Sequence, residues 1–83
     1  MKYKVGDRVV VKEDLRKHGK YFMESGIDNS NTATDEMVKL RGKVVTITDI
    51  SGNGQYVINN QKGRFSFLWT DEMFEGVKEW NIY

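Results

Sequence analysis

Short alternations of apolar and polar residues run through the chain, and clusters of turn-forming residues separate them. A period of two is typical of strands that bury one face. The turn clusters SGNG (51–54) and NQKG (60–63) are rich in residues that adopt hairpin-turn conformations. The pattern therefore predicts an all-β domain built around a three-stranded meander. The strand-like segments are VGDRVVVKED (5–14), GKVVTITDI (42–50), GQYVINN (54–60) and GRFSFLW (63–69).

The register of the meander follows if both turn clusters are four-residue loops. Ile47 then lies opposite Ile58, and Tyr56 lies opposite Phe67. Opposed residues share a sheet face, and a slip of one residue would mix the two faces. The face expected to line the core holds Val45, Ile47, Tyr56, Ile58, Phe65, Phe67 and Trp69. The opposite, mostly neutral face holds Thr46, Thr48, Val57, Ser66 and Leu68, with Ile50 at its end.

The aromatic run KGRFSFLW (62–69) has an alternative interpretation as a base-stacking platform, because alternate aromatics stack bases in some nucleic-acid-binding strands. Arg64 interrupts that pattern. Each aromatic side chain buries about 150–250 Å², and a domain this small has few other large apolar groups. We therefore assign these rings to the core.

The tetrapeptide TDEM occurs twice, at 34–37 and at 70–73. Each copy offers a threonine N-cap, two acids in the first turn and an apolar methionine, which predicts short helical turns at 34–40 and 70–75. Trp69 and Phe74 occupy the positions of a hydrophobic staple around the second copy. Residues 15–40 form a long excursion between strands. Its segment MESGIDNSNTAT (23–34) is polar and aperiodic and is predicted to be a loop.

The order of these elements is that of a small five-stranded SH3-like barrel. The strings M-x-x-x-R-G-K-V-x-T-I (37–47) and W-x-D-E-M (69–73) resemble small proteins encoded by bacteriophages and prophages of Gram-positive bacteria, and the resemblance spans nearly the whole chain. It implies that 15–40 is an RT-type loop and that VKEWNIY (77–83) is the last strand. It supplies no catalytic residue and no ligand. The chain departs from the pattern by an enlarged polar loop at 25–34.

The composition narrows the function classes. The chain has 83 residues, no cysteine and one histidine, so we expect a single domain without disulfides, thiolate metal sites or a Ser-His-Asp triad. Residues 28–35 alternate oxygen ligands but lack the glycine and glutamate of a calcium loop. No phosphate loop or nucleophile motif is present. We expect a non-enzymatic cytoplasmic protein without metal or cofactor, and neither a signal peptide nor a membrane span.

The formal net charge is only +1, but the charge is segregated. Residues 1–20 carry seven basic and three acidic groups, whereas residues 21–38 carry four acidic groups and no basic one. Such blocks guide a partner without identifying it. The basic candidates for nucleic-acid binding are Arg16, Lys17, Lys20, Lys39, Arg41 and Lys43; most such runs are solvated loops.

Three functional hypotheses remain open. The first is a protein-binding module that inhibits or redirects a bacterial or phage protein, as in host takeover or anti-defence. The second is a nucleic-acid-binding protein that uses the basic candidates. The third is a structural protein that associates with itself. The candidates for protein binding are Thr46, Thr48, Val57, Ser66, Leu68 and Tyr83.

Overall fold

The structure is a computed structural model that describes residues 2–24, 26–59 and 67–78; for residues 26–28 it describes the backbone only. These described residues form six short strands and two short helical turns. The strands are β1 (Arg8–Val11), β2 (Lys20–Met23), β3 (Gly26–Thr32), β4 (Val44–Ile50), β5 (Tyr56–Ile58) and β6 (Phe74–Val77). The helical turns are α1 (Asp35–Val38) and the 3-10 turn η1 (Asp71–Met73).

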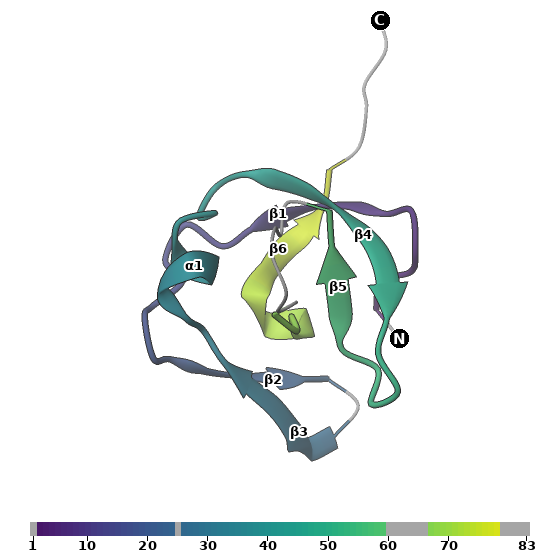
Figure 1. Cartoon of the computed structure of the whole chain (residues 1–83), viewed down its shortest axis with the longest axis horizontal. Coiled ribbons are helices and arrows are strands. Elements are labelled where there is room, and N and C mark those ends of the chain that lie inside the picture. The colour runs from purple at the N-terminus through teal and green to yellow at the C-terminus, as the bar shows by residue number, and fades with distance from the viewer. Residues whose placement is uncertain (1, 25, 60–66, 79–83) are drawn as a thin grey trace, which may run out of the picture.

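The strands form two antiparallel sheets (Figure 1). One has four strands in the order β5-β4-β1-β6, and the other is the β2–β3 hairpin. Figure 1 shows η1 lying between the hairpin and the larger sheet. The expectation of an all-β domain is confirmed. The strands of the described residues do not close into a barrel, because no ladder joins the hairpin to the four-stranded sheet.

The hairpin of β4 and β5 has the central pair that the sequence predicts, Ile47 opposite Ile58. The register then shifts between Ile47 and Asp49, so that Ile50 lies opposite Tyr56. Five residues connect that last pair, one more than the predicted loop of four. A β-bulge absorbs the extra residue, which is why the central pair keeps its predicted partner.

The third strand of the meander pairs differently from the prediction. Tyr56 bonds to Trp69 rather than to Phe67, through backbone N–H···O distances of 2.8 and 2.9 Å. The predicted register is wrong by two residues, and because side chains alternate with a period of two, the same face still points inward. Trp69 is fully buried, whereas Phe67 packs partly buried against the core. The predicted partners Phe65 and Ser66 lie outside the described residues.

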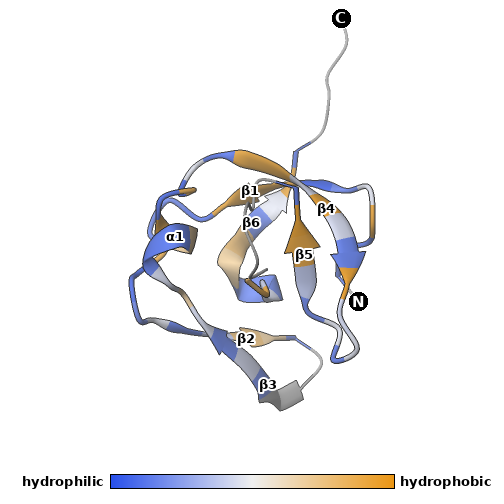
Figure 2. Cartoon of the chain, viewed as in Figure 1, coloured by the Kyte–Doolittle hydropathy of each residue, from blue (hydrophilic) through white to orange (hydrophobic). Residues whose placement is uncertain are grey.

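The core is centred on an aromatic cluster. The rings of Trp69 and Phe74 stack with centroids 5.4 Å apart, which confirms the predicted staple around η1. Tyr3 meets Tyr56 and Phe74 edge-on at 5.6 and 5.7 Å, an arrangement that aromatic quadrupoles favour. Figure 2 shows that the hydrophobic residues gather in β1, β4 and β5, while β3 is largely polar. The other buried apolar residues are Val9, Val11, Leu15, Met23, Ala33, Met37, Val45, Ile47, Ile58 and Met73.

The segment 23–34 is not a loop, and this prediction is wrong. Residues 26–32 form β3, in which Asn31 lies opposite Tyr21 and Ser30 opposite Phe22. Asparagine and serine have low strand propensity, so the sequence pattern does not reveal the strand. Side-chain bonds compensate, since the Asn31 amide donates to the Leu68 carbonyl at 2.8 Å.

Both TDEM copies form the predicted turns. Thr34 caps α1, and its hydroxyl accepts a bond from Met37 N–H at 3.3 Å. Thr70 is the N-cap of η1, but its hydroxyl makes no capping bond. β6 begins at Phe74 and ends at Val77, so the predicted turn at 70–75 is too long, and the predicted strand at 77–83 shares only Val77 with β6. Residues 79–83 lie outside the described part of the chain.

Candidate functional site

The side of the large sheet that faces away from the core carries small uncharged residues from three strands. We call Val10, Val44, Thr46, Thr48 and Val57 the outer face. Four of them are half-buried and Thr48 is exposed. Its three valines neither belong to the core cluster nor are among the partly buried apolar residues that pack against it. Alternation along β1, β4 and β5 places these residues on the face opposite Val9, Val45 and Tyr56.

The outer face is flanked by two charges that the sequence prediction did not include. Arg8 lies opposite Thr46, so the two residues share a face. The bulge sets Asp49 opposite Val57. The same bulge turns Ile50 against the core, which corrects its predicted place on the outer face. The surface therefore has a β-branched, uncharged centre between a cation and an anion.

The predicted protein-binding candidates come together as far as the structure describes them. Thr46, Thr48 and Val57 share the outer face. Leu68 is half-buried and, by the Tyr56–Trp69 bridge, lies beside Val57. Ser66 and Tyr83 lie outside the described residues.

The predicted nucleic-acid-binding candidates are partly engaged by acids of α1. Lys17 forms an ion pair with Asp35 at 3.0 Å. Lys39 forms another with Glu36 at 3.3 Å. Exposed pairs of this kind are worth at most about 1 kcal/mol, but they lower the local positive potential.

The other four basic candidates are exposed in two separate parts of the chain. Arg16 precedes the turn at His18, and the Lys20 ammonium lies 5.4 Å from the centroid of the Phe22 ring. Arg41 and Lys43 flank a turn that bonds to Val11 at the end of β1.

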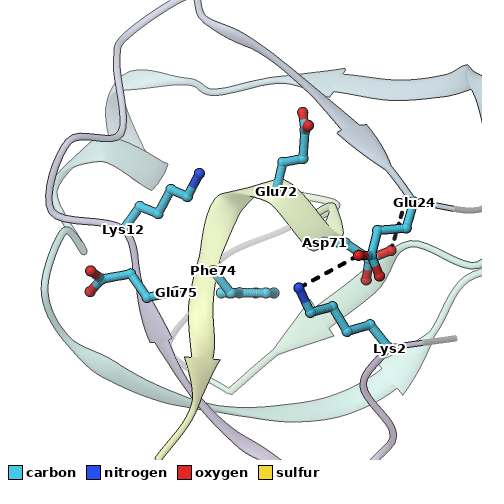
Figure 3. Close-up of a pocket in the computed structure, with 7 residues that line it drawn as sticks. All are labelled: Lys2, Lys12, Glu24, Asp71, Glu72, Phe74 and Glu75. Carbon is cyan, nitrogen blue, oxygen red and sulfur yellow. Dashed lines mark hydrogen bonds and ion pairs between the residues drawn. The ribbon is translucent and has the colours of Figure 1, made fainter.

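A groove of about 430 Å³ opens beside η1 (Figure 3). The Phe74 ring lies in the middle of its lining, with Lys12 and Glu75 on one side and Lys2 and Asp71 on the other. Four carboxylates against two ammonium groups give its lining a net negative charge. The described residues that line it are Lys2, Lys12, Glu24, Asp71, Glu72, Phe74 and Glu75.

Two of these carboxylates hold the edge of β2. The Phe22 N–H donates to Glu72 Oε1 at 2.8 Å, and the Glu24 N–H donates to Asp71 Oδ2 at 2.9 Å. These N–H groups belong to alternate residues, so they point from one edge of the strand. Carboxylate oxygens thus accept the bonds that a neighbouring strand would otherwise accept.

Asp71 also anchors a buried network. Its Oδ1 accepts a bond from the Tyr56 hydroxyl at 2.5 Å, and that hydroxyl accepts one from the Tyr3 N–H at 3.1 Å. Burial raises the pKa of the Tyr56 phenol, and its bond to the Asp71 carboxylate raises this pKa further. Burial also raises the pKa of Tyr3, which nearby Lys2 opposes. Both Asp71 oxygens are occupied, so the carboxylate joins η1, β2 and β5.

Sequence reasoning missed these roles, because it assigned Asp71 and Glu72 only to the first turn of a helix. The sequence carries one weak signal. Asp71 lies between Trp69 and the apolar pair Met73 and Phe74, and a carboxylate drawn into the core with these residues would be costly without hydrogen bonds. Its partners are 15 and 47 residues away along the chain, so no local pattern identifies them.

Neither a metal centre nor a membrane helix is found in the described part of the chain. No three His, Cys, Asp or Glu side chains converge there as metal ligands. Neither of its short helical turns is long or apolar enough to cross a membrane. Comparisons of the chain with protein-family models, with curated proteins and with solved structures find no match.

Proposed function

We propose that the chain is a non-enzymatic protein-binding module that engages its partner through the outer face. The observation that carries this proposal is a three-stranded surface of small uncharged side chains whose valines are not among the residues that pack against the core. Solvated sheet faces usually alternate core residues with polar or charged ones. Here Val10, Val44 and Val57 take those positions, and burying them against a partner would be favourable.

The order of elements supports an SH3-like architecture for this module. A hairpin follows β1, a meander begins at β4, and a 3-10 turn precedes the last strand, which pairs with β1. This agrees with the resemblance to small phage and prophage proteins. On that basis the partner is a bacterial or phage protein in the bacterial cytoplasm, which the module inhibits or redirects.

Nucleic-acid binding is the weaker proposal. Affinity for a phosphate backbone depends on several lysines and arginines acting together. Lys17 and Lys39 pair with acids, and the chain has a net charge of only +1. This function predicts binding that falls steeply with salt, and absence of binding to DNA or RNA at low ionic strength, measured by fluorescence anisotropy, would exclude it.

The test of the protein-binding proposal is affinity capture from a lysate of a Gram-positive bacterium, followed by mass spectrometry. The wild-type chain is compared with Val57→Glu, which places a charge in the outer face. Val5→Glu is the matched control, because Val5 is an exposed valine outside that face. We expect a stoichiometric protein that wild type and Val5→Glu retain and Val57→Glu loses. Circular dichroism checks that both variants are folded.

Two results would contradict the proposal. Recovery of nucleic acid without a stoichiometric protein would favour the second function. Equal retention of the partner by both variants would show that the outer face is not the binding surface. A second copy of the chain is the remaining alternative for that surface, and sedimentation velocity at high protein concentration detects it as a dimer.

A further inference from the structure

The β2–β3 hairpin is joined to the rest of the molecule mainly by bonds from side chains. Along β2, the carboxylates of Asp71 and Glu72 accept hydrogen bonds from the N–H groups of Glu24 and Phe22, respectively. No backbone ladder links the hairpin to the four-stranded sheet within the described ranges 2–24, 26–59 and 67–78.

Side-chain amides make the corresponding bonds along β3. The Gln55 Nε2 group donates to Asn29 Oδ1 at 2.7 Å and to the Ser30 carbonyl at 3.1 Å. The Asn31 amide donates to the Leu68 carbonyl at 2.8 Å. The carboxylates and the amides thus attach the hairpin along both of its edges.

Few of the hairpin side chains that the structure describes belong to the hydrophobic core. Of the β2 side chains only Met23 is buried, while Tyr21 and Phe22 are half-buried, and Tyr21 packs against the core. In β1 and β5, and in β4 as far as Ile47, by contrast, every second residue is buried. Segments with few buried apolar contacts are the ones that open locally while the rest of a protein stays folded.

We propose that the β2–β3 hairpin is a strap that the carboxylates of Asp71 and Glu72 latch in place, and that it opens as a unit without unfolding of the four-stranded sheet. Glu24, Asp71 and Glu72 are all lining residues of the groove. Opening of the strap therefore widens the groove and frees the β2 edge. This gating does not depend on the outer face, so it goes beyond the proposed function.

The strength of the latch comes from the charge of its acceptors. Hydrogen bonds to an ionised carboxylate are roughly twice as strong as those between neutral groups. Glu72 is exposed and can be replaced without disturbing the core, whereas Asp71 is buried at 3% exposure. Glu75 supplies the matched control, because it is an exposed glutamate of the same groove whose carboxylate makes no bond to a described residue.

Hydrogen exchange measured residue by residue by NMR tests the strap, in wild type, Glu72→Ala, Glu72→Gln and Glu75→Ala. In Glu72→Ala we expect the Phe22 amide and the other amides of the β2–β3 ladder to exchange about tenfold faster, as when a charge-assisted bond is lost. Amides of the β1–β4 ladder should keep their wild-type protection. Glu72→Gln should give a smaller increase confined to the same amides, and Glu75→Ala should change neither ladder.

Three outcomes would overturn the strap. Unchanged exchange in the hairpin ladder beyond Phe22 would show that the latch does not control the unit. An equal increase in the hairpin and in the β1–β4 ladder would show one cooperative unit. The same hairpin response in Glu75→Ala would show a general effect of groove charge. If Glu72→Ala does not fold, Glu72→Gln decides by the same comparison of the two ladders.

Discussion

At the scale of single residues, the Asp71 carboxylate connects η1 to two distant parts of the chain. Its two oxygens bind the Tyr56 hydroxyl and the Glu24 N–H, which belong to β5 and to the chain just after β2. A buried carboxylate is costly unless hydrogen bonds satisfy it. The Tyr56 phenol of the surrounding aromatic cluster supplies such a hydrogen bond to the Asp71 carboxylate.

Replacing Tyr56 with phenylalanine tests this network. Tyr56→Phe removes the donor to Asp71 and the acceptor of the Tyr3 N–H. The substitution removes two buried hydrogen bonds, the charge-assisted bond to Asp71 and the bond from the Tyr3 N–H. We therefore expect the free energy of unfolding to fall by about 2–3 kcal/mol. Urea denaturation followed by tryptophan fluorescence measures it.

The control is Tyr21→Phe, which makes the same chemical change at a half-buried residue. The Tyr21 hydroxyl accepts one bond from the Arg16 N–H at 2.9 Å, at an exposed site. We expect a loss of about 0.5–1 kcal/mol there. Equal losses in the two variants would show that the Asp71 network adds no stability of its own.

Single residues also show which features of the fold can be predicted from the sequence. Alternation identified Val45, Ile47, Tyr56, Ile58 and Trp69 as core residues, because burial of one strand face leaves a periodic signal. The bonds of Asp71 leave no periodic signal, since they connect residues that only the tertiary fold brings together. The bulge near Thr48 is invisible for a similar reason, and it alone decides that Ile50 points inward.

At the scale of elements, the two TDEM turns show that one motif can have two energetic outcomes. In both turns the threonine N–H donates to the methionine sulfur, at 3.5 Å in the first and 3.4 Å in the second. The methionine therefore takes the place that glutamate or glutamine has in a capping box. Thr34 uses its hydroxyl as a cap, whereas the buried Thr70 hydroxyl has no hydrogen-bond partner among the described residues.

The substitution of threonine by valine should therefore lower the stability at position 34 but not at position 70. Thr34→Val loses a cap and should lower the free energy of unfolding by about 1 kcal/mol. Thr70→Val keeps the shape and removes a buried unbonded hydroxyl, so it should leave the stability unchanged or raise it by about 1 kcal/mol. Thermal and urea denaturation of both variants measure the difference. A loss at Thr70 as large as that at Thr34 would show that the second hydroxyl does cap η1.

Element prediction from the sequence succeeds where apolar side chains define the strand and fails where polar ones do. The segments that became β1, β4 and β5 all carry buried valines, isoleucines or tyrosine at alternate positions. β3 has the sequence GIDNSNT, in which asparagine and serine stand where alternating apolar residues would indicate a strand. Its stability as a strand comes from β2 and from amide bonds to residues 53–55 and 68, which lie far away in the sequence.

At the scale of the whole molecule, the four-stranded sheet and the hairpin are joined by the hydrogen bonds of Asp71 and Glu72. The aromatic cluster stabilises the sheet side, and the carboxylates of η1 attach the hairpin side. The outer face lies on the far side of the sheet from both. The proposed partner binding at the outer face and the proposed opening of the strap therefore depend on different residues, and the variants Val57→Glu and Glu72→Ala test them separately.

The buried tyrosines Tyr56 and Tyr3 should make the stability of the whole molecule fall at high pH. In the unfolded chain a tyrosine has a pKa near 10.0, and in the folded chain burial raises the pKa of both Tyr56 and Tyr3. Below pH 10 both states hold these protons, and the stability contribution is fully present. Above pH 10 the unfolded state loses protons that the folded state keeps, so rising pH favours unfolding, by up to about 1.4 kcal/mol per pH unit for each group.

Urea denaturation at pH 8, 9, 10 and 11 checks this expectation. The free energy of unfolding should be nearly constant from pH 8 to 9 and fall between pH 10 and 11. In Tyr56→Phe the fall should be shallower, because one of the two groups responsible is gone. An equal slope in wild type and Tyr56→Phe would mean that the Tyr56 phenol is not the group that the fold keeps protonated, and would remove the buried phenol–carboxylate bond as the link between the sheet and η1.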